Sequence, residues 1–105
     1  MNTNNKIDEL NVLRKLKIKP SISQRELAKD LSLSLGKINY CLKALKQKGL
    51  IKVKNFKKSP HKYKYIYLIT PKGVSEKTKL TINFMKQKIR EYDELKSELK
   101  QREKF

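Results

Sequence analysis

The sequence predicts a small α+β chain that is mainly helical, and three observations carry that prediction. Apolar residues recur at helical spacing in three short segments between residues 5 and 48. The period then changes to two between residues 51 and 69, as in a β-hairpin. Finally, a long helical pattern runs from Pro71 to about Lys104. These patterns divide the 105 residues into one compact domain, residues 5–70, and one extended helix, residues 71–105.

The first helix is predicted from Asn5 to about Lys17. Its apolar residues follow three-residue steps, with Val12 beside them, and so form one buried stripe. Asn5 is a suitable N-cap, and Asp8 lies in the first turn, where a negative charge is favourable. The stripe consists of Ile7, Leu10, Leu13 and Leu16.

Two further helix starts follow within a few residues of each other. Ser23 and Glu26 form a capping box, and Ile22 and Leu27 are placed to make a hydrophobic staple across it. Ser34 repeats the N-cap for a third helix. We expect the helices to cover Gln24 to about Leu31 and Leu35 to about Lys48, with Gly49 as the left-handed stop and Ile38, Leu42 and Leu45 as the buried stripe. Because the linker between them is so short, the pair predicts a helix-turn-helix.

A β-hairpin is expected directly after these helices. Polar and apolar residues alternate over residues 51–56 and 63–69, and residues 57–62 read as a basic loop that contains Pro60. A hairpin that follows a helix-turn-helix is a wing, so the predicted architecture is a winged helix-turn-helix.

The last helix is predicted to begin at Thr70 and Pro71, which are favoured as N-cap and first helical residue. Its apolar residues follow heptad-like steps of 3, 4, 3 and 7, and Lys96 occupies the skipped position. Such a seam predicts a dimerisation helix. The predicted contact residues are Ile82, Met85, Ile89, Tyr92, Leu95 and Leu99.

The charge of the chain bears on its partners. Lys and Arg number 27 against 10 Asp and Glu, a formal net charge of +17 that attracts polyanions. Residues 1–73 carry a net charge of +14, whereas residues 74–105 carry only +3. Nucleic acid is the commonest partner of such a domain, and an anionic membrane surface is second. A lysine-rich background from AT-rich codons does not explain the uneven distribution.

The sequence argues against several other classes of protein, namely disulfide-stabilised, zinc-binding, membrane-spanning, secreted and catalytic ones. Cys41 is the only cysteine, so no intrachain disulfide forms, and it cannot build a zinc site with the single histidine. No apolar run reaches the roughly 18 residues that span a bilayer. The first residues lack the apolar segment of a signal peptide, so a cytoplasmic protein is expected. Phosphate-binding and paired-histidine motifs are absent from the sequence. We therefore expect no catalysis, metal or cofactor.

A known family shares several of these segments. Residues 23–28 (SQRELA), 33–40 (LSLGKINY), 45–51 (LKQKGLI) and 67–73 (YLITPKG) resemble the winged helix-turn-helix of MarR-type transcriptional regulators. The short chain with its long last helix is similar to small regulators associated with extracellular polysaccharide gene clusters. The resemblance implies a dimeric bacterial or archaeal protein that binds double-stranded DNA near the nucleoid. The sequence departs from the family pattern in two ways: it lacks the extra N-terminal helix of typical members, and its wing has no arginine. Because the usual effector pocket lies at that N-terminal helix, the resemblance does not define a small-molecule effector.

The residues expected to contact DNA lie off the buried stripes. The third helix would enter the major groove, the start of the second would bind a phosphate, and the wing would follow the backbone. Each set has a plain alternative, namely solvated helix surface, an ordinary capping box and a solubilising loop. His61 and Cys41 read mainly as a surface and a core residue, with pH or redox sensing as the minor alternative. The predicted DNA contacts are Ser23, Gln24, Arg25, Ser34, Gly36, Lys37, Asn39, Tyr40, Lys43, Lys57, Lys58, His61 and Lys62.

Three functions compete at this point. The first is a sequence-specific dimeric regulator with recognition helices roughly 34–36 Å apart on a palindromic site. The second is a nonspecific architectural or RNA-binding protein, which the scarcity of arginine favours because arginine is the better reader of bases. The third is a protein–protein adaptor that presents the long helix to a partner.

Overall fold

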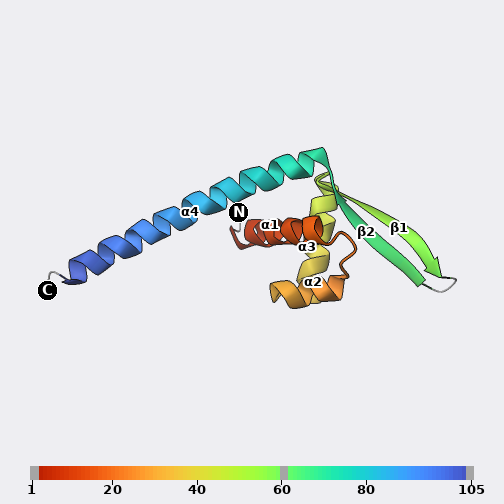
Figure 1. Cartoon of the computed structure of the whole chain (residues 1–105), viewed down its shortest axis with the longest axis horizontal. Coiled ribbons are helices and arrows are strands. Elements are labelled where there is room, and N and C mark those ends of the chain that lie inside the picture. The colour runs from red at the N-terminus through yellow and green to blue at the C-terminus, as the bar shows by residue number, and fades with distance from the viewer. Residues whose placement is uncertain (1–2, 60–61, 104–105) are drawn as a thin grey trace.

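The computed structural model describes residues 3–59 and 62–103, with side chains for residues 5–55 and 64–101. It has the predicted α+β architecture, mainly helical, with one two-stranded antiparallel sheet. The short helices cluster beneath the first half of the last helix, while the hairpin and the distal half of that helix project in opposite directions (Figure 1). The elements are α1 (Thr3–Ile18), α2 (Gln24–Leu31), α3 (Leu35–Gln47), β1 (Ile51–Ser59), β2 (Lys62–Ile69) and α4 (Pro71–Glu103).

The core lies where α1, α2, α3 and the base of the hairpin meet. The apolar stripes of the three helices are buried together, and Leu80 of α4 packs against them from outside. Removing a buried leucine side chain from water stabilises a fold by roughly 1.5–3 kcal/mol, so this cluster is the main source of stability. Its members are Val12, Leu13, Leu16, Ile22, Leu27, Ile38, Cys41, Leu42, Leu45, Leu50, Ile51 and Tyr67.

The helix-turn-helix is built as its capping residues predict. The hydroxyl of Ser23 accepts a hydrogen bond from the amide of Glu26 at 3.1 Å, and that of Ser34 accepts one from the amide of Lys37 at 3.0 Å. Only half of the predicted capping box is realised, because the carboxylate of Glu26 instead accepts a hydrogen bond from Lys19 at 2.8 Å. Between the helices, Ser32 adopts a left-handed conformation with φ of 54°.

One predicted cap is wrong. The first helix begins at Thr3, so Asn5 lies within α1 and not at its end. Its side chain is used elsewhere, since its amide oxygen accepts a hydrogen bond from the amine of Lys37 on α3. A contact between two helices far apart in sequence therefore decides the role of Asn5.

The hairpin strands are longer than predicted. β1 and β2 pair from Ile51 with Ile69 outward to Ser59 with Lys62, with one irregularity between Lys57 and Ser59. Most of the predicted loop is therefore strand. The hairpin is tied to the helices by the amide of Tyr67, which donates a hydrogen bond to the carbonyl oxygen of Pro20 at 2.9 Å.

The junction between the hairpin and α4 is tightly packed. The hydroxyl of Thr70 accepts a hydrogen bond from the amide of Gly73 at 3.0 Å, as an N-cap should. Gly73 lies so close to the chain that an added Cβ would come within 2.0 Å of the carbonyl oxygen of Leu50. From this anchored start α4 runs along α1 and then beyond the domain, which gives the molecule a longest dimension of 71 Å.

Candidate nucleic-acid interface

α3 presents one buried face and one open face. Ile38, Cys41, Leu42 and Leu45 are at most 5% exposed, and they face the core as the sequence predicts. The opposite face is open to solvent, and Tyr40 there is 58% exposed. The predicted DNA contacts Ser34, Gly36, Asn39, Tyr40 and Lys43 all lie on exposed positions.

The lysines of α3, together with its C-cap residue Lys48, fall into two groups. The amine of Lys37 lies 3.7 Å from the carboxylate of Asp8, and that of Lys48 lies 2.8 Å from the carboxylate of Glu9. Both partners are on α1. Lys43 and Lys46 form no ion pair within the described part of the chain. The free positive charge of α3 therefore lies on the side away from α1.

Lys37 is thus more constrained than the sequence indicates. Besides Asp8 and Asn5, its amine lies 5.4 Å from the centre of the Tyr40 ring. These contacts hold the side chain on the α1 side of α3. Of the two α3 lysines predicted to contact DNA, Lys43 is the unpaired one.

A groove lies between α3 and the base of the hairpin. It has a volume of about 290 Å³, and it brings Asn39 and Lys43 beside Tyr65 of β2, which is 51% exposed. Gln24 also lines it, and its side-chain amide donates a hydrogen bond of 3.5 Å to the hydroxyl of Tyr67. The structure therefore brings predicted contacts from α2 and α3 to one surface.

Two residues of this groove were missed by the sequence analysis. Lys46 lies one turn after Lys43 on the same side of α3, so helical spacing was a signal that could have found it. Tyr65 gave no such signal, because strand alternation alone does not say which face of a hairpin meets a helix.

The start of α2 lies at the edge of the same region. Arg25 is exposed in its first turn, and the amides there are oriented as in other helix N-termini. Of the hairpin lysines, Lys52 and Lys54 are exposed and Lys64 is half-buried. His61 and the side chains of Lys57, Lys58 and Lys62 lie outside the described residues.

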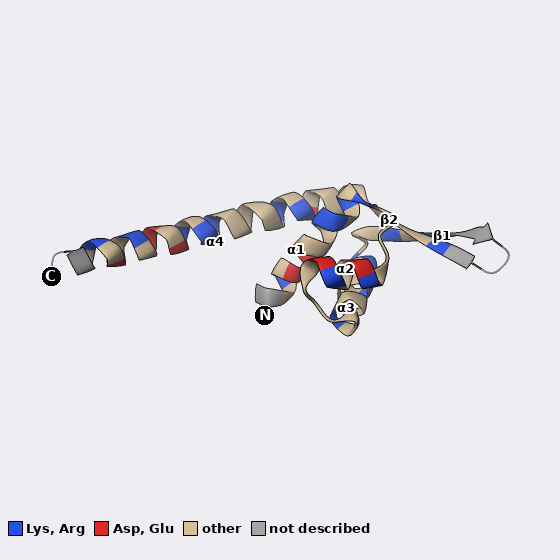
Figure 2. Ribbon diagram, turned by 60° about the horizontal axis from the view of Figure 1, so that its bottom comes forward, with Lys and Arg blue, Asp and Glu red and all other residues tan. Residues whose placement is uncertain are grey.

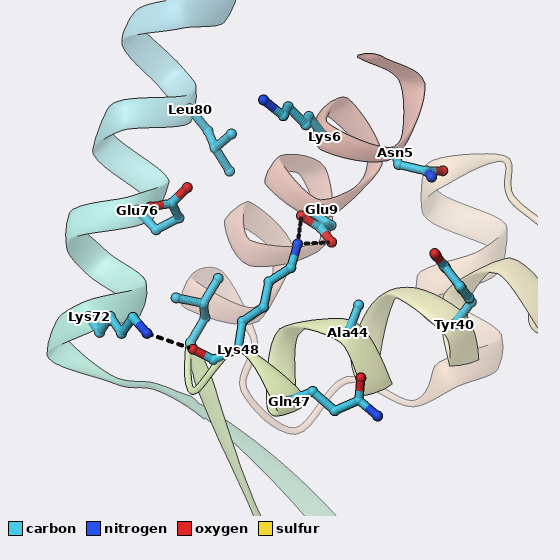
Figure 3. A pocket seen from close by; sticks show the side chains of 11 residues that line it. Asn5, Lys6, Glu9, Tyr40, Ala44, Gln47, Lys48, Lys72, Glu76 and Leu80 are labelled. Atoms are coloured by element: carbon cyan, nitrogen blue, oxygen red, sulfur yellow. Dashed lines mark hydrogen bonds and ion pairs between the residues drawn. The ribbon is translucent and has the colours of Figure 1, made fainter. Parts of the chain in front are cut away.

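A separate cleft of about 630 Å³ opens between α1, the end of α3 and the start of α4 (Figure 3). The Glu9–Lys48 ion pair crosses it, and the amine of Lys72 donates a hydrogen bond of 3.1 Å to the carbonyl oxygen of Lys48. Glu9 is only 7% exposed, and its ion pair with Lys48 holds the C-terminal end of α3 against α1, while the hydrogen bond from Lys72 joins it to α4. The contacts across this cleft thus set the position of α3.

The described residues also bear on the cysteine thiol, metal binding and membrane crossing. Cys41 is 1% exposed, and burial raises the pKa of its thiol above the ordinary value. Within residues 3–59 and 62–103, no three His, Cys, Asp or Glu side chains gather as metal ligands would. None of the helices described combines the length and the apolar character that crossing a membrane requires.

The predicted dimerisation residues all lie on α4, on a different side of the helix from Leu80 and Phe84, which face α1. Ile82, Met85, Ile89, Tyr92, Leu95 and Leu99 are between 47% and 63% exposed. Within the described chain, about half or more of the surface of each side chain is left open to solvent, which is unusual for six large apolar side chains on one helix.

Comparison with known proteins agrees with this geometry. Residues 6–52 match the family described as winged helix-turn-helix DNA-binding. The match covers most of α1, all of α2 and α3, and the start of β1. No curated protein sequence matches the chain.

Solved structures of regulators share the fold. The PcaV transcriptional regulator of Streptomyces coelicolor superposes with a TM-score of 0.64 at 18% identity, covering 74% of this chain and 54% of its own. S. aureus MepR F27L, bound to an oligodeoxyribonucleotide, gives 0.61 at 19% identity, covering 90% and 74%. BldR of Sulfolobus solfataricus gives 0.61 at 22%, covering 90% and 70%. The chain therefore spans about half the length of PcaV, and at these identities the likeness establishes the fold.

Proposed function

From the premise that this chain has the MarR-type winged helix-turn-helix fold, we propose that it is a transcription regulator that binds a palindromic duplex DNA site as a homodimer. The observation that carries the proposal is the open face of α3, where Asn39, Tyr40 and Lys43 are exposed while the opposite stripe is buried in the core. α3 inserts this face into the major groove.

The side chains on this face suit base edges. The amide of Asn39 can pair with adenine through two hydrogen bonds, and Lys43 can donate to guanine or to a phosphate. Tyr40 reaches a phosphate with its hydroxyl or a thymine methyl with its ring. Apart from its chain neighbours and the backbone of α3 itself, no atom lies within 4 Å of a Cβ built on Gly36, so this position is open to close approach by DNA.

The surrounding basic residues fix the protein on the phosphates. Arg25 and the amides at the start of α2 meet one strand, and the hairpin lysines, among them Lys52 and Lys54, follow the backbone beside the groove. Such contacts release counterions, so affinity falls steeply with salt. The oligodeoxyribonucleotide bound to the similar fold of MepR supports this assignment.

The exposed seam of α4 supports the homodimer. Two copies joined along this seam bring two α3 helices to one duplex, and a twofold protein reads a palindromic site. The division of labour follows the predicted boundary, with residues 5–70 binding DNA and residues 71–105 joining the copies.

The first experiment compares two charge reversals that alter net charge equally. Lys43→Glu lies on the proposed interface, and Lys100→Glu is a matched control near the exposed end of α4. Binding to a duplex selected from a random pool is measured by fluorescence anisotropy over a salt series. We expect Lys43→Glu to weaken binding at least about 10-fold and to lower the salt slope by about one, and Lys100→Glu to do neither.

Equal weakening by both variants would show that only net charge matters. If regulation in cells survives reversal of both Lys37 and Lys43, α3 does not enter the groove, and the chain acts through a protein partner. Unchanged binding by Lys43→Glu with correct folding would reject the interface directly.

One observation favours a second candidate, nonspecific binding to DNA or RNA. α3 and both strands contain lysine but no arginine, and arginine is the better reader of guanine. Selection from a random duplex pool separates the candidates. A recovered palindromic motif supports the regulator, whereas a pool that yields no motif supports the architectural protein.

A further inference from the structure

The two halves of α4 carry opposite charge. Residues 71–90 contain six Lys or Arg and one acid, a net charge of +5, whereas residues 91–103 contain five acids and three basic residues, a net charge of −2. Figure 2 shows the acidic residues of the helix gathered mainly in its distal half. The apolar seam runs through both halves, so any helix that covers it meets a basic and then an acidic segment.

Lys96 interrupts the seam at a heptad position that apolar residues otherwise occupy. It follows Ile89 by seven residues, so it faces the same way. In a parallel pair each Lys96 would face its own copy across the seam. In an antiparallel pair centred between Arg90 and Glu91, the two Lys96 residues lie about 16 Å apart along the axis, beyond the screening length of about 8 Å at physiological salt.

We infer that α4 pairs in antiparallel orientation with α4 of a second copy, about an axis between Arg90 and Glu91. The inference rests on the homodimer proposed above and specifies its geometry. With this centre Ile82, Met85, Ile89, Tyr92 and Leu99 each meet a seam position of the partner, while Leu95, at the edge of the seam, lies opposite position 86. The layers are Ile82 with Leu99 of the partner subunit, Met85 with Lys96 of the partner subunit, and Ile89 with Tyr92 of the partner subunit.

The charges favour the same orientation. The acidic distal half of each helix lies along the basic proximal half of the other, whereas a parallel pair would align +5 with +5 and −2 with −2. The side of α4 that packs on α1, marked by Leu80 and Phe84, differs from the seam, so both contacts form at once. The two winged domains then lie toward opposite ends of the paired helices.

Cysteine cross-linking tests the orientation. In a Cys41→Ala background, one chain carries Ile82→Cys and a second, of distinguishable size, carries Leu99→Cys. Both positions are exposed in the monomer, so the fold tolerates the changes. We expect the mixed sample to form a disulfide between different chains and each single variant to remain largely uncross-linked. Cross-linking of Ile82→Cys alone would show a parallel pair and overturn the inference.

Spin labels away from the seam give a second measurement. Labels at Glu94→Cys and at Gln101→Cys are separated along an antiparallel pair by about 10 Å and about 30 Å, but by similar distances in a parallel pair. A distance that does not increase toward the end of the helix overturns the inference. Sedimentation of the unmodified chain separates the two proposals, because a monomer rejects the homodimer itself, whereas a dimer with the wrong label distances rejects only its orientation.

Discussion

The winged domain and the distal half of α4 use apolar residues in opposite ways. Leu13, Leu27 and Leu45 are completely buried among three helices and the hairpin, whereas Tyr92, Leu95 and Leu99 are each 63% exposed. The first set stabilises the monomer whatever its concentration. The second contributes only when another surface covers it, so its free energy is available for association. The difference separates the residues that stabilise the monomer from the exposed residues that the proposed homodimer would bury.

The largest effect on stability is expected from shortening a side chain in the core of the winged domain. Leu45→Ala removes a fully buried side chain from α3 and should lower the free energy of unfolding by about 2–5 kcal/mol. Leu99→Ala removes the same atoms from an exposed position, so it should weaken association and leave the monomer within about 0.5 kcal/mol. Urea denaturation at two protein concentrations distinguishes them. If both variants lost the same free energy of unfolding at both protein concentrations, Leu45 and Leu99 would not differ in role as we expect.

The next effect concerns the junction between the two regions. A Cβ at Gly73 would lie 2.0 Å from the carbonyl oxygen of Leu50 and 2.8 Å from Cγ2 of Ile69. Because backbone cannot yield as a side chain does, Gly73→Ala should destabilise the fold by about 1–3 kcal/mol or more. Ser75→Ala is the control, since Ser75 is exposed on the same helix. Thermal denaturation that places both variants at the wild-type midpoint would contradict the close packing.

Local signals explain what the sequence analysis predicted correctly. The caps at Ser23 and Ser34 and the left-handed Gly49, with φ of 74°, depend on neighbours within a few residues, so the corresponding helix ends match the structure. The buried stripe of α3 was likewise recoverable, because helical periodicity already separates its two faces.

Contacts between distant segments explain the rest. The position of Lys37 depends on Asn5 and Asp8 of α1, and that of Glu26 on Lys19. No spacing rule within either helix contains this information. The same holds for Tyr65, which joins the groove only because β2 folds back beside α3. The composition of the α3 surface was thus predictable, but its division into paired and free lysines was not.

A smaller effect is expected on the reactivity of cysteine, which should differ between a buried and an exposed thiol. Burial raises the pKa of Cys41 above its ordinary value of 9.0, so the folded state favours the neutral thiol. The resulting stability is fully present below pH 9 and is lost as pH rises through the folded pKa. Ellman's reagent should react slowly with native Cys41 and quickly with Ser97→Cys in a Cys41→Ala background, because Ser97 is exposed and is not a seam residue. Rapid reaction of native Cys41 would remove it from the core and restore redox sensing as an interpretation.

The smallest effect on stability belongs to Gly36, and there stability and binding should change in opposite directions. Apart from its chain neighbours and the backbone of α3, a Cβ at this position has no atom within 4 Å, so Gly36→Ala introduces no clash with the rest of the described monomer. Alanine is the better helix former, and the variant should gain up to about 1 kcal/mol. The added methyl group projects from the open face of α3, where we place the floor of the major groove, so DNA affinity should fall. Anisotropy and thermal denaturation on one sample measure both quantities. A variant that is more stable and binds as tightly as the wild type would show that the backbone at Gly36 does not approach DNA, and the interface would then be centred on Lys43 and Lys46.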